Sequence, residues 1–251
     1  MPKLRFTGTV YPKQIKTSIT NHPRINWKST DLGFSLDIGV EINENKVTID
    51  CDIDKFDSEK HLTPIVMRAY DTARTAIDLV SFTTGNGLVF VLDTFTDPDG
   101  NTTAVAPQQP ELAALSTAVA KPEDFDRILR MVLTEPPLFL VLRDLIDAIT
   151  QWHRAPVNTA RVLDGLRHLI APGEEPRSGW PKLRAALRVE ESYLKYVTDQ
   201  SAPPRHGDPS HIPGEVTRKV AERAWTVFNR YLEYRKRGGQ PLPESEFPML
   251  S

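Results

Sequence analysis

The chain has little of what marks several large classes of protein. Its 251 residues include a single cysteine, Cys51, so no internal disulfide can form and nothing indicates an oxidising compartment. The longest apolar runs, such as residues 138–142, are far shorter than a membrane span, and the first ten residues contain no apolar segment of the signal-peptide type. We therefore expect a cytoplasmic protein that does not contact a membrane.

The chain also lacks an excess of charge of either sign. Its 31 basic and 33 acidic residues give a formal net charge of −2 at pH 7, and 39% of the residues are hydrophobic. Because no global positive field attracts nucleic acid, any surface that binds RNA or phosphate must be local. At this length and composition the chain can bury the core of one large domain or of two small ones.

Two turn-like segments do not match the loops that bind dinucleotides or calcium. Gly85-Asn-Gly87 lacks the third glycine of the GxGxxG pattern and follows a predicted helix rather than a strand, which argues against a dinucleotide loop. Asp97-Pro-Asp-Gly100 lacks the regular oxygen ligands and the distal glutamate of an EF-hand, so a β-turn is favoured. We expect no cofactor.

The first hundred residues have the periodicity of strands. Apolar residues alternate with polar or small ones over residues 34–42 and again over 47–53, on either side of a short polar turn. This pattern predicts an antiparallel hairpin with one buried face. Cys51 belongs to the second run, where we interpret it as a small core residue.

The rest of this half predicts further strands and one helix. Helical spacing of apolar residues from about residue 61 to 80 predicts the main helix. Additional strands are expected at residues 4–10, 88–95 and 102–105. Residues 1–110 therefore predict an α+β domain, an antiparallel sheet with one main helix, which we interpret as a sensor or partner-binding module.

Beyond a connector at residues 106–122 the strand signals disappear and helical spacing repeats. Amphipathic helices are predicted at residues 125–133, 138–152, 158–170, 180–197 and 216–231. Successive helices with modest loops are typical of an up-and-down bundle, which we place at residues 122–237, followed by a C-terminal tail at 238–251.

The segment 203–211, Pro-Pro-Arg-His-Gly-Asp-Pro-Ser-His, concentrates ionisable residues between two predicted helices. Proline, glycine, aspartate and serine form turns and caps, so one interpretation is a simple connecting loop. Turn formation alone does not account for an arginine and two histidines in so short a segment. We therefore treat Arg205, His206, Asp208 and His211 as candidate site residues.

Two kinds of chemistry fit these residue types. The guanidinium of Arg205 matches phosphate oxygens, and His211 can exchange a proton with a ribose hydroxyl near neutral pH, so the pair could cleave RNA without a metal. Alternatively, His206, Asp208 and His211 could be ligands of zinc, manganese or iron, although the sequence supplies no obvious further ligands.

Arg205 and His211, five residues apart between two helices, resemble the R-x4–6-H motif of the HEPN superfamily. These helical bundles include many metal-independent ribonucleases of toxin and antiviral systems, and the position after the arginine, here His206, is commonly Asn, Asp or His. The resemblance covers about residues 122–237. It implies that Arg205 and His211 are catalytic with His206 and Asp208 in support, that RNA is the substrate, and that two copies form one composite site.

Three functional hypotheses follow. The first is a HEPN-like metal-independent endoribonuclease, a toxin or antiviral effector whose N-terminal domain binds a protein partner such as an antitoxin. The second is a non-catalytic interaction protein that forms a homodimer through the bundle or binds a nucleotide. The third is a metal-dependent hydrolase.

Overall fold

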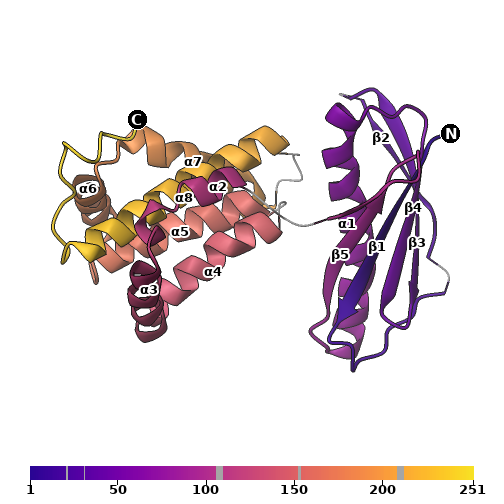
Figure 1. The fold of residues 1–251 in the computed structure, drawn as a ribbon, viewed down its shortest axis with the longest axis horizontal. Coiled ribbons are helices and arrows are strands. Elements are labelled where there is room, and N and C mark those ends of the chain that lie inside the picture. Colours follow the sequence, from indigo (N-terminus) through magenta and orange to yellow (C-terminus); the bar gives the residue numbers. More distant parts are fainter. Residues whose placement is uncertain (21, 31, 106–109, 152–153, 208–211) are drawn as a thin grey trace. The chain divides into compact units, whose positions relative to one another are not determined.

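The computed structural model describes residues 1–20, 22–30, 32–105, 110–151, 154–207 and 212–251. The chain divides into two compact units, Met1–Ala106 and Pro107–Ser251 (Figure 1). Each unit encloses its own hydrophobic core. The predicted fold class, an antiparallel sheet with one main helix followed by an all-helical region, is confirmed.

The N-terminal unit contains a six-stranded antiparallel sheet in the order β2-β3-β4-β1-β5-β6. In chain order the strands are β1 (Lys3–Tyr11), β2 (Ile25–Ser29), β3 (Phe34–Asn43), β4 (Lys46–Ile53), β5 (Val89–Thr96) and β6 (Thr102–Ala104). The predicted hairpin is β3 and β4, and its turn residues Glu44 and Asn45 have the positive φ angles, 47° and 73°, that tight hairpins require. Edge strand β2 was missed, because its five residues include only two apolar side chains, Ile25 and Trp27, and none of the five is fully buried.

One face of the sheet is covered by the long helix α1 (Ser58–Thr84). The helix begins at Asp57, whose carboxylate accepts the backbone N–H groups of Glu59 and Lys60, and it buries an apolar stripe that includes Ile65 and Ile77. The opposite sheet face is mostly polar, with pairs such as Arg5–Asp50 and Thr9–Asp93, although Val89 and Val91 of β5 are exposed there. Cys51 is only 1% exposed beneath the helix, and this burial raises the pKa of its thiol to about 12, which confirms its interpretation as a core residue.

The described residues from 110 onward form helices and one isolated β-bridge between Val189 and Leu250. The helices are α2 (Pro110–Ala114), a short 3₁₀ helix (Thr117–Val119), α3 (Pro122–Thr134), α4 (Pro136–Thr150), α5 (Ala155–Ile170), α6 (Pro176–Leu187), α7 (Glu191–Arg205) and α8 (Gly214–Lys236). Helix α5 is central, since it packs against α4, α6, α7 and α8. None of the helices within the described ranges is long and apolar enough to cross a membrane.

The segment after α8 folds back onto the helical unit. Leu242 is 3% exposed, and its backbone N–H donates to the Ala186 carbonyl at 2.9 Å. The buried guanidinium of Arg230 donates to three backbone carbonyls, those of Leu187, Arg188 and Pro248. Burial lowers the pKa of Arg230, and these carbonyls stabilise its charge.

Helices α4 and α5 approach each other closely at Gly165. A Cβ atom at this position would overlap the Val141 side chain, which is itself 3% exposed in the core. Glycine is normally unfavourable in a helix interior. At this crossing, its missing side chain is what allows the two helices to meet.

We predict that Gly165→Ala destabilises the protein by about 1–3 kcal/mol, because the added methyl overpacks the α4–α5 contact. Urea unfolding followed by circular dichroism measures this free energy. The matched control is Gly214→Ala, where a Cβ meets open space at the start of α8 and stability should not fall. In the double variant Gly165→Ala, Val141→Ala, the loss should be smaller than the sum of the single losses; strict additivity would contradict the proposed overlap.

Candidate functional site

The segment 203–211 is only partly a loop. The expectation that Arg205 lies in a loop was wrong, because Pro203, Pro204 and Arg205 form the last turn of α7. The prolines lack an N–H group, but their carbonyls still accept hydrogen bonds from the N–H groups of His206, at 3.1 Å, and Gly207, at 3.3 Å, which closes the turn. His206 is the C-cap residue.

Arg205 faces a carboxylate. Its Nη2 lies 3.7 Å from Oδ2 of Asp164 on α5, and the two side chains are 38% and 50% exposed. Partial burial raises the pKa of Asp164, and the positive charge of Arg205 opposes this effect. The pair is thus a partly exposed ion pair that links α7 to α5.

Asp208 and His211 lie outside the described residues. The catalytic pairing of Arg205 with His211, and the alternative metal site that needs Asp208 and His211, therefore stay predictions. Among the described residues, no group of three or more His, Cys, Asp or Glu side chains is placed to hold a metal ion.

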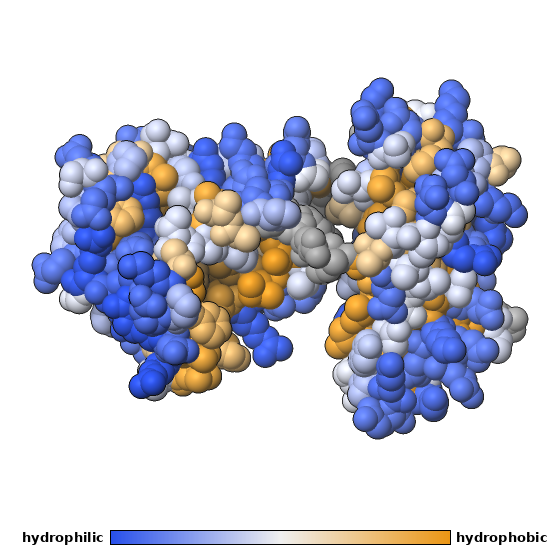
Figure 2. Space-filling model, viewed as in Figure 1, coloured by the Kyte–Doolittle hydropathy of each residue, from blue (hydrophilic) through white to orange (hydrophobic). Residues whose placement is uncertain are grey.

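Helices α3 and α4 expose an apolar surface that sequence analysis did not single out. Helix α3 buries Ile128 and Val132, yet Phe125, Leu129 and Leu133, spaced four residues apart on the adjoining side of the helix, are 56%, 43% and 69% exposed. On α4, Phe139 and Ile146 are 44% and 40% exposed. Figure 2 shows hydrophobic surface gathered over α3 and α4. We call these five residues the α3–α4 apolar face.

The corner between α3 and α4 is fixed by an ion pair. Glu135, the residue between the two helices, accepts two hydrogen bonds from Arg235 of α8, one of them at 2.7 Å. Arg235 also donates to the hydroxyl of the buried Tyr231 at 2.6 Å. Hydrogen bonds from Arg235 lower the pKa of Glu135. This contact ties the orientation of the apolar face to the core helix α8.

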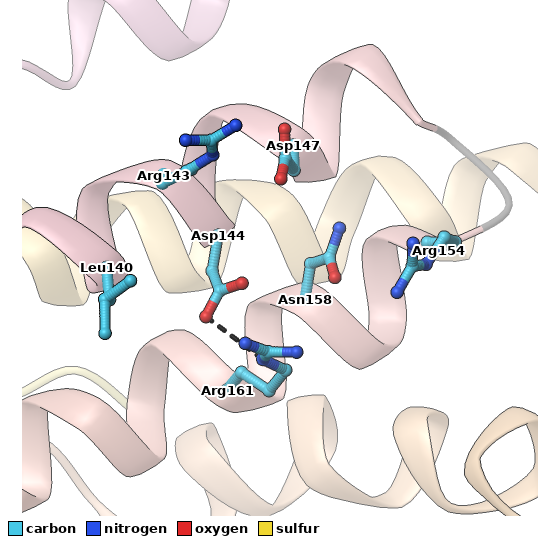
Figure 3. Close-up of a pocket in the computed structure, with 7 residues that line it drawn as sticks. All are labelled: Leu140, Arg143, Asp144, Asp147, Arg154, Asn158 and Arg161. Atoms are coloured by element: carbon cyan, nitrogen blue, oxygen red, sulfur yellow. Dashed lines mark hydrogen bonds and ion pairs between the residues drawn. The ribbon is translucent and has the colours of Figure 1, made fainter. Parts of the chain in front are cut away.

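A polar pocket of about 190 Å³ lies between α4 and α5 (Figure 3). It is lined by Leu140, Arg143, Asp144, Asp147, Arg154, Asn158 and Arg161. Across it, Arg161 of α5 donates to Asp144 of α4 at 3.1 Å. The sequence pattern did not predict this site, although the spacing of Arg143, Asp144 and Asp147 places them on one side of a helix.

Asn158 is the least expected residue of the pocket. It is 3% exposed, lies in the first turn of α5 and lines the cavity. Within the described ranges, its side-chain amide has no hydrogen-bond partner, whereas its buried neighbour Thr159 donates to the Ala155 and Pro156 carbonyls. Among the described residues, the fully buried polar atoms without a partner are Nε of Arg68 and Nε of Arg167, so the amide of Asn158 keeps contact with the pocket and is an unused donor and acceptor at its wall.

Comparison with family models accounts for both units of the chain. Residues 4–106 match the N-terminal domain, and residues 125–236 the C-terminal domain, of one domain of unknown function, DUF8168. The two matches follow the order of the sheet unit and the helical unit, and together they cover most of the chain. The chain belongs to the DUF8168 family. No curated protein and no solved structure matches it.

Membership of DUF8168 corrects the HEPN resemblance, which was wrong. The helical region that carries Arg205 matches the DUF8168 C-terminal domain, and no HEPN model matches. The resemblance depended on two residues at a permitted spacing, and such a pair arises by chance in helical proteins. In the DUF8168 chain, Arg205 instead ends a helix beside Asp164.

We predict that Glu135→Gln destabilises the protein by about 1–2 kcal/mol at pH 7, because it removes a charged hydrogen-bonded partner of Arg235. The folded protein lowers the pKa of Glu135 below its ordinary value of 4.5. The stabilisation is therefore complete above pH 4.5 and is lost as the pH falls through the lower, folded value.

Denaturant unfolding of both proteins from pH 7 to pH 3 tests this linkage, and the difference in unfolding free energy should narrow at the acid end. The control is Glu222→Gln, whose ion pair with Arg218 spans 3.6 Å between exposed side chains and should change stability by less than about 0.5 kcal/mol. A Glu135→Gln difference that stays constant down to pH 3 would show that the charge of Glu135 contributes nothing.

Proposed function

We propose that this protein is a non-catalytic interaction protein whose helical unit forms a homodimer through the α3–α4 apolar face. The observation that carries the proposal is the outward apolar stripe Phe125, Leu129 and Leu133 on α3. Single exposed apolar residues are ordinary on protein surfaces, but a contiguous apolar face marks a site of association.

The stripe is not explained by the core of the helical unit. Helix α3 buries Ile128 and Val132 against that core, and Phe125, Leu129 and Leu133 continue its apolar surface on the adjoining side of the helix, beyond the core contact. An apolar surface wider than the contact with the core leaves room for a second partner. Phe139 and Ile146 extend the outward face onto α4.

The charges beside the stripe favour a second copy of the same chain as the partner. Asp126 and Arg130 are exposed and lie one helical turn apart along one edge of the stripe, with Leu129 between them in height. In a two-fold symmetric dimer the same patch meets itself in reverse direction. With the two-fold axis level with residue 128, midway between them along the helix, Asp126 of each copy faces Arg130 of the other, and the apolar residues meet beside them.

The catalytic alternatives have less support. The only described member of the supposed catalytic pair, Arg205, is occupied by Asp164. The proposal requires no chemistry from residues 203–211. Cleavage of RNA by the purified protein in EDTA would overturn its non-catalytic part.

We predict a dimer by light scattering at micromolar concentration, and a monomer for Leu129→Glu, because the variant buries a charge at the centre of the interface. The matched control is Phe82→Glu on α1, which is 85% exposed on the other unit and should stay dimeric. A monomeric wild-type protein, or loss of the dimer in both variants, would contradict the proposal.

A charge reversal tests the symmetry of the interface. Asp126→Arg and Arg130→Asp should each weaken the dimer, since each places like charges opposite one another, by about tenfold or more in dissociation constant. The double variant should regain dimerisation, because opposite charges then face each other again. Sedimentation equilibrium measures all three constants. Failure of the double variant to recover, with normal circular dichroism, would exclude this antiparallel arrangement.

A further inference from the structure

We propose that the pocket between α4 and α5 binds the phosphate group of a small molecule, through Arg143, Arg154 and Asn158. This site is distinct from the α3–α4 apolar face. The pocket residues Leu140, Arg143, Asp144 and Asp147 follow one side of α4, whereas Phe139 and Ile146 follow another. The proposal therefore does not depend on dimerisation.

The charges around the pocket favour an anion. Three guanidinium groups and two carboxylates line it, and Asp144 is already paired with Arg161 at 3.1 Å. Arg143 and Arg154 then face one remaining carboxylate, Asp147. Within the part of the chain that the structure describes, the guanidinium of Arg154 makes one long hydrogen bond, 3.5 Å, to the Gln151 side chain, so it can turn to a ligand. Guanidinium groups bind phosphate with two parallel hydrogen bonds.

The position of the pocket along α5 adds to this attraction. Helix α5 begins at Ala155, with Arg154 as its N-cap residue and Asn158 in its first turn. The N-terminal end of a helix carries a partial positive charge from unpaired N–H groups, which stabilises a nearby anion. The negative charge of Asp147 reduces this attraction. A dianionic phosphate is attracted to the arginines more strongly than a monoanionic one, so it overcomes the repulsion from Asp147 best.

Asn158 is the observation that separates a binding site from a solvated polar surface. A solvated surface needs no buried amide, yet Asn158 is 3% exposed, unpartnered among the described residues and part of the pocket wall. A phosphate oxygen would give Nδ2 of Asn158, which has no acceptor among the described residues, a hydrogen-bond partner.

The size of the pocket limits what enters it. A volume of about 190 Å³ holds a phosphate group and a few attached atoms, and it is smaller than the about 300–1,000 Å³ typical of sites that enclose whole ligands. We therefore assign the pocket to the phosphate group itself, with the rest of the molecule outside. Leu140, 57% exposed at the pocket, offers apolar contact to that remainder.

Titration of the full chain followed by amide NMR shifts tests the site. The probes are inorganic phosphate, glucose 6-phosphate and adenosine 5′-monophosphate, with adenosine as the control that lacks phosphate. All three phosphates should shift amides of residues 143–151 and 154–161, and adenosine should not. If one ester has a lower dissociation constant than inorganic phosphate, that ester identifies the kind of molecule that supplies the phosphate group. No shift with any phosphate at about 10 mM, beyond the weak end of specific binding, overturns the proposal.

Substitutions test which side chains contact the phosphate. Arg143→Gln and Arg154→Gln should each raise the dissociation constant about tenfold or more, since each removes a charged hydrogen bond. Asn158→Asp, nearly identical in shape, should abolish binding by placing a carboxylate against the phosphate. The matched control is Arg177→Gln, an exposed arginine of α6 outside the pocket, which should leave the constant unchanged. If Arg177→Gln weakens phosphate binding as much as the pocket variants do, the effect comes from general surface charge and the proposal is overturned.

The pH dependence of phosphate binding by the unmutated protein gives a further check. Phosphate esters gain their second negative charge near a pKa of about 6, so binding should be stronger at pH 7.5 than at pH 5.5.

The thermal midpoint of each variant, measured in parallel with the binding constants, shows whether Asn158→Asp is folded. If it is not, the two arginine variants decide the proposal alone.

Discussion

The close contact of α4 with α5 is the constraint on which the helical unit depends. Gly165 permits it, because any side chain there would overlap Val141. The contact buries one side of α4, and it brings polar side chains of both helices together along the seam beside it. If α5 were pushed outward by one methyl group, the core would loosen and the pocket between Arg143 and Asn158 would change shape.

Helix α4 shows how one helix can serve three purposes at once. Leu138, Val141, Leu145 and Ala148 face the core, Leu140, Arg143 and Asp147 face the pocket, and Phe139 and Ile146 remain outward and apolar. These sets differ only by their place in the helical turn. The ion pair between Glu135 and Arg235 links the corner from which α3 continues the apolar face to the core helix α8.

The sequence was sufficient for the fold class and for most elements, because period-two and helical spacing each record which residues must be buried. It was not sufficient for the surfaces. Phe125, Ile128, Leu129, Val132 and Leu133 all mark α3 as a helix, but only Ile128 and Val132 point to the core. Periodicity shows that a helix has an apolar side. Which of the apolar residues contact the core depends on how the neighbouring helices pack. The pocket was missed for the same reason, since Arg143 and Asn158 meet only across two helices.

The error over segment 203–211 has a different physical origin. Prolines usually break helices, so a run that contains Pro203 and Pro204 predicted a loop. In the last turn of a helix, however, carbonyls need partners more than N–H groups do, and the N–H of His206 supplies one. Arg205 consequently stays on α7 and reaches Asp164 of α5. A short motif of arginine and histidine carries functional meaning only when the fold brings both side chains to one ligand. The site proposed between α4 and α5 starts from that requirement, because its arginines and its buried amide already line a single cavity.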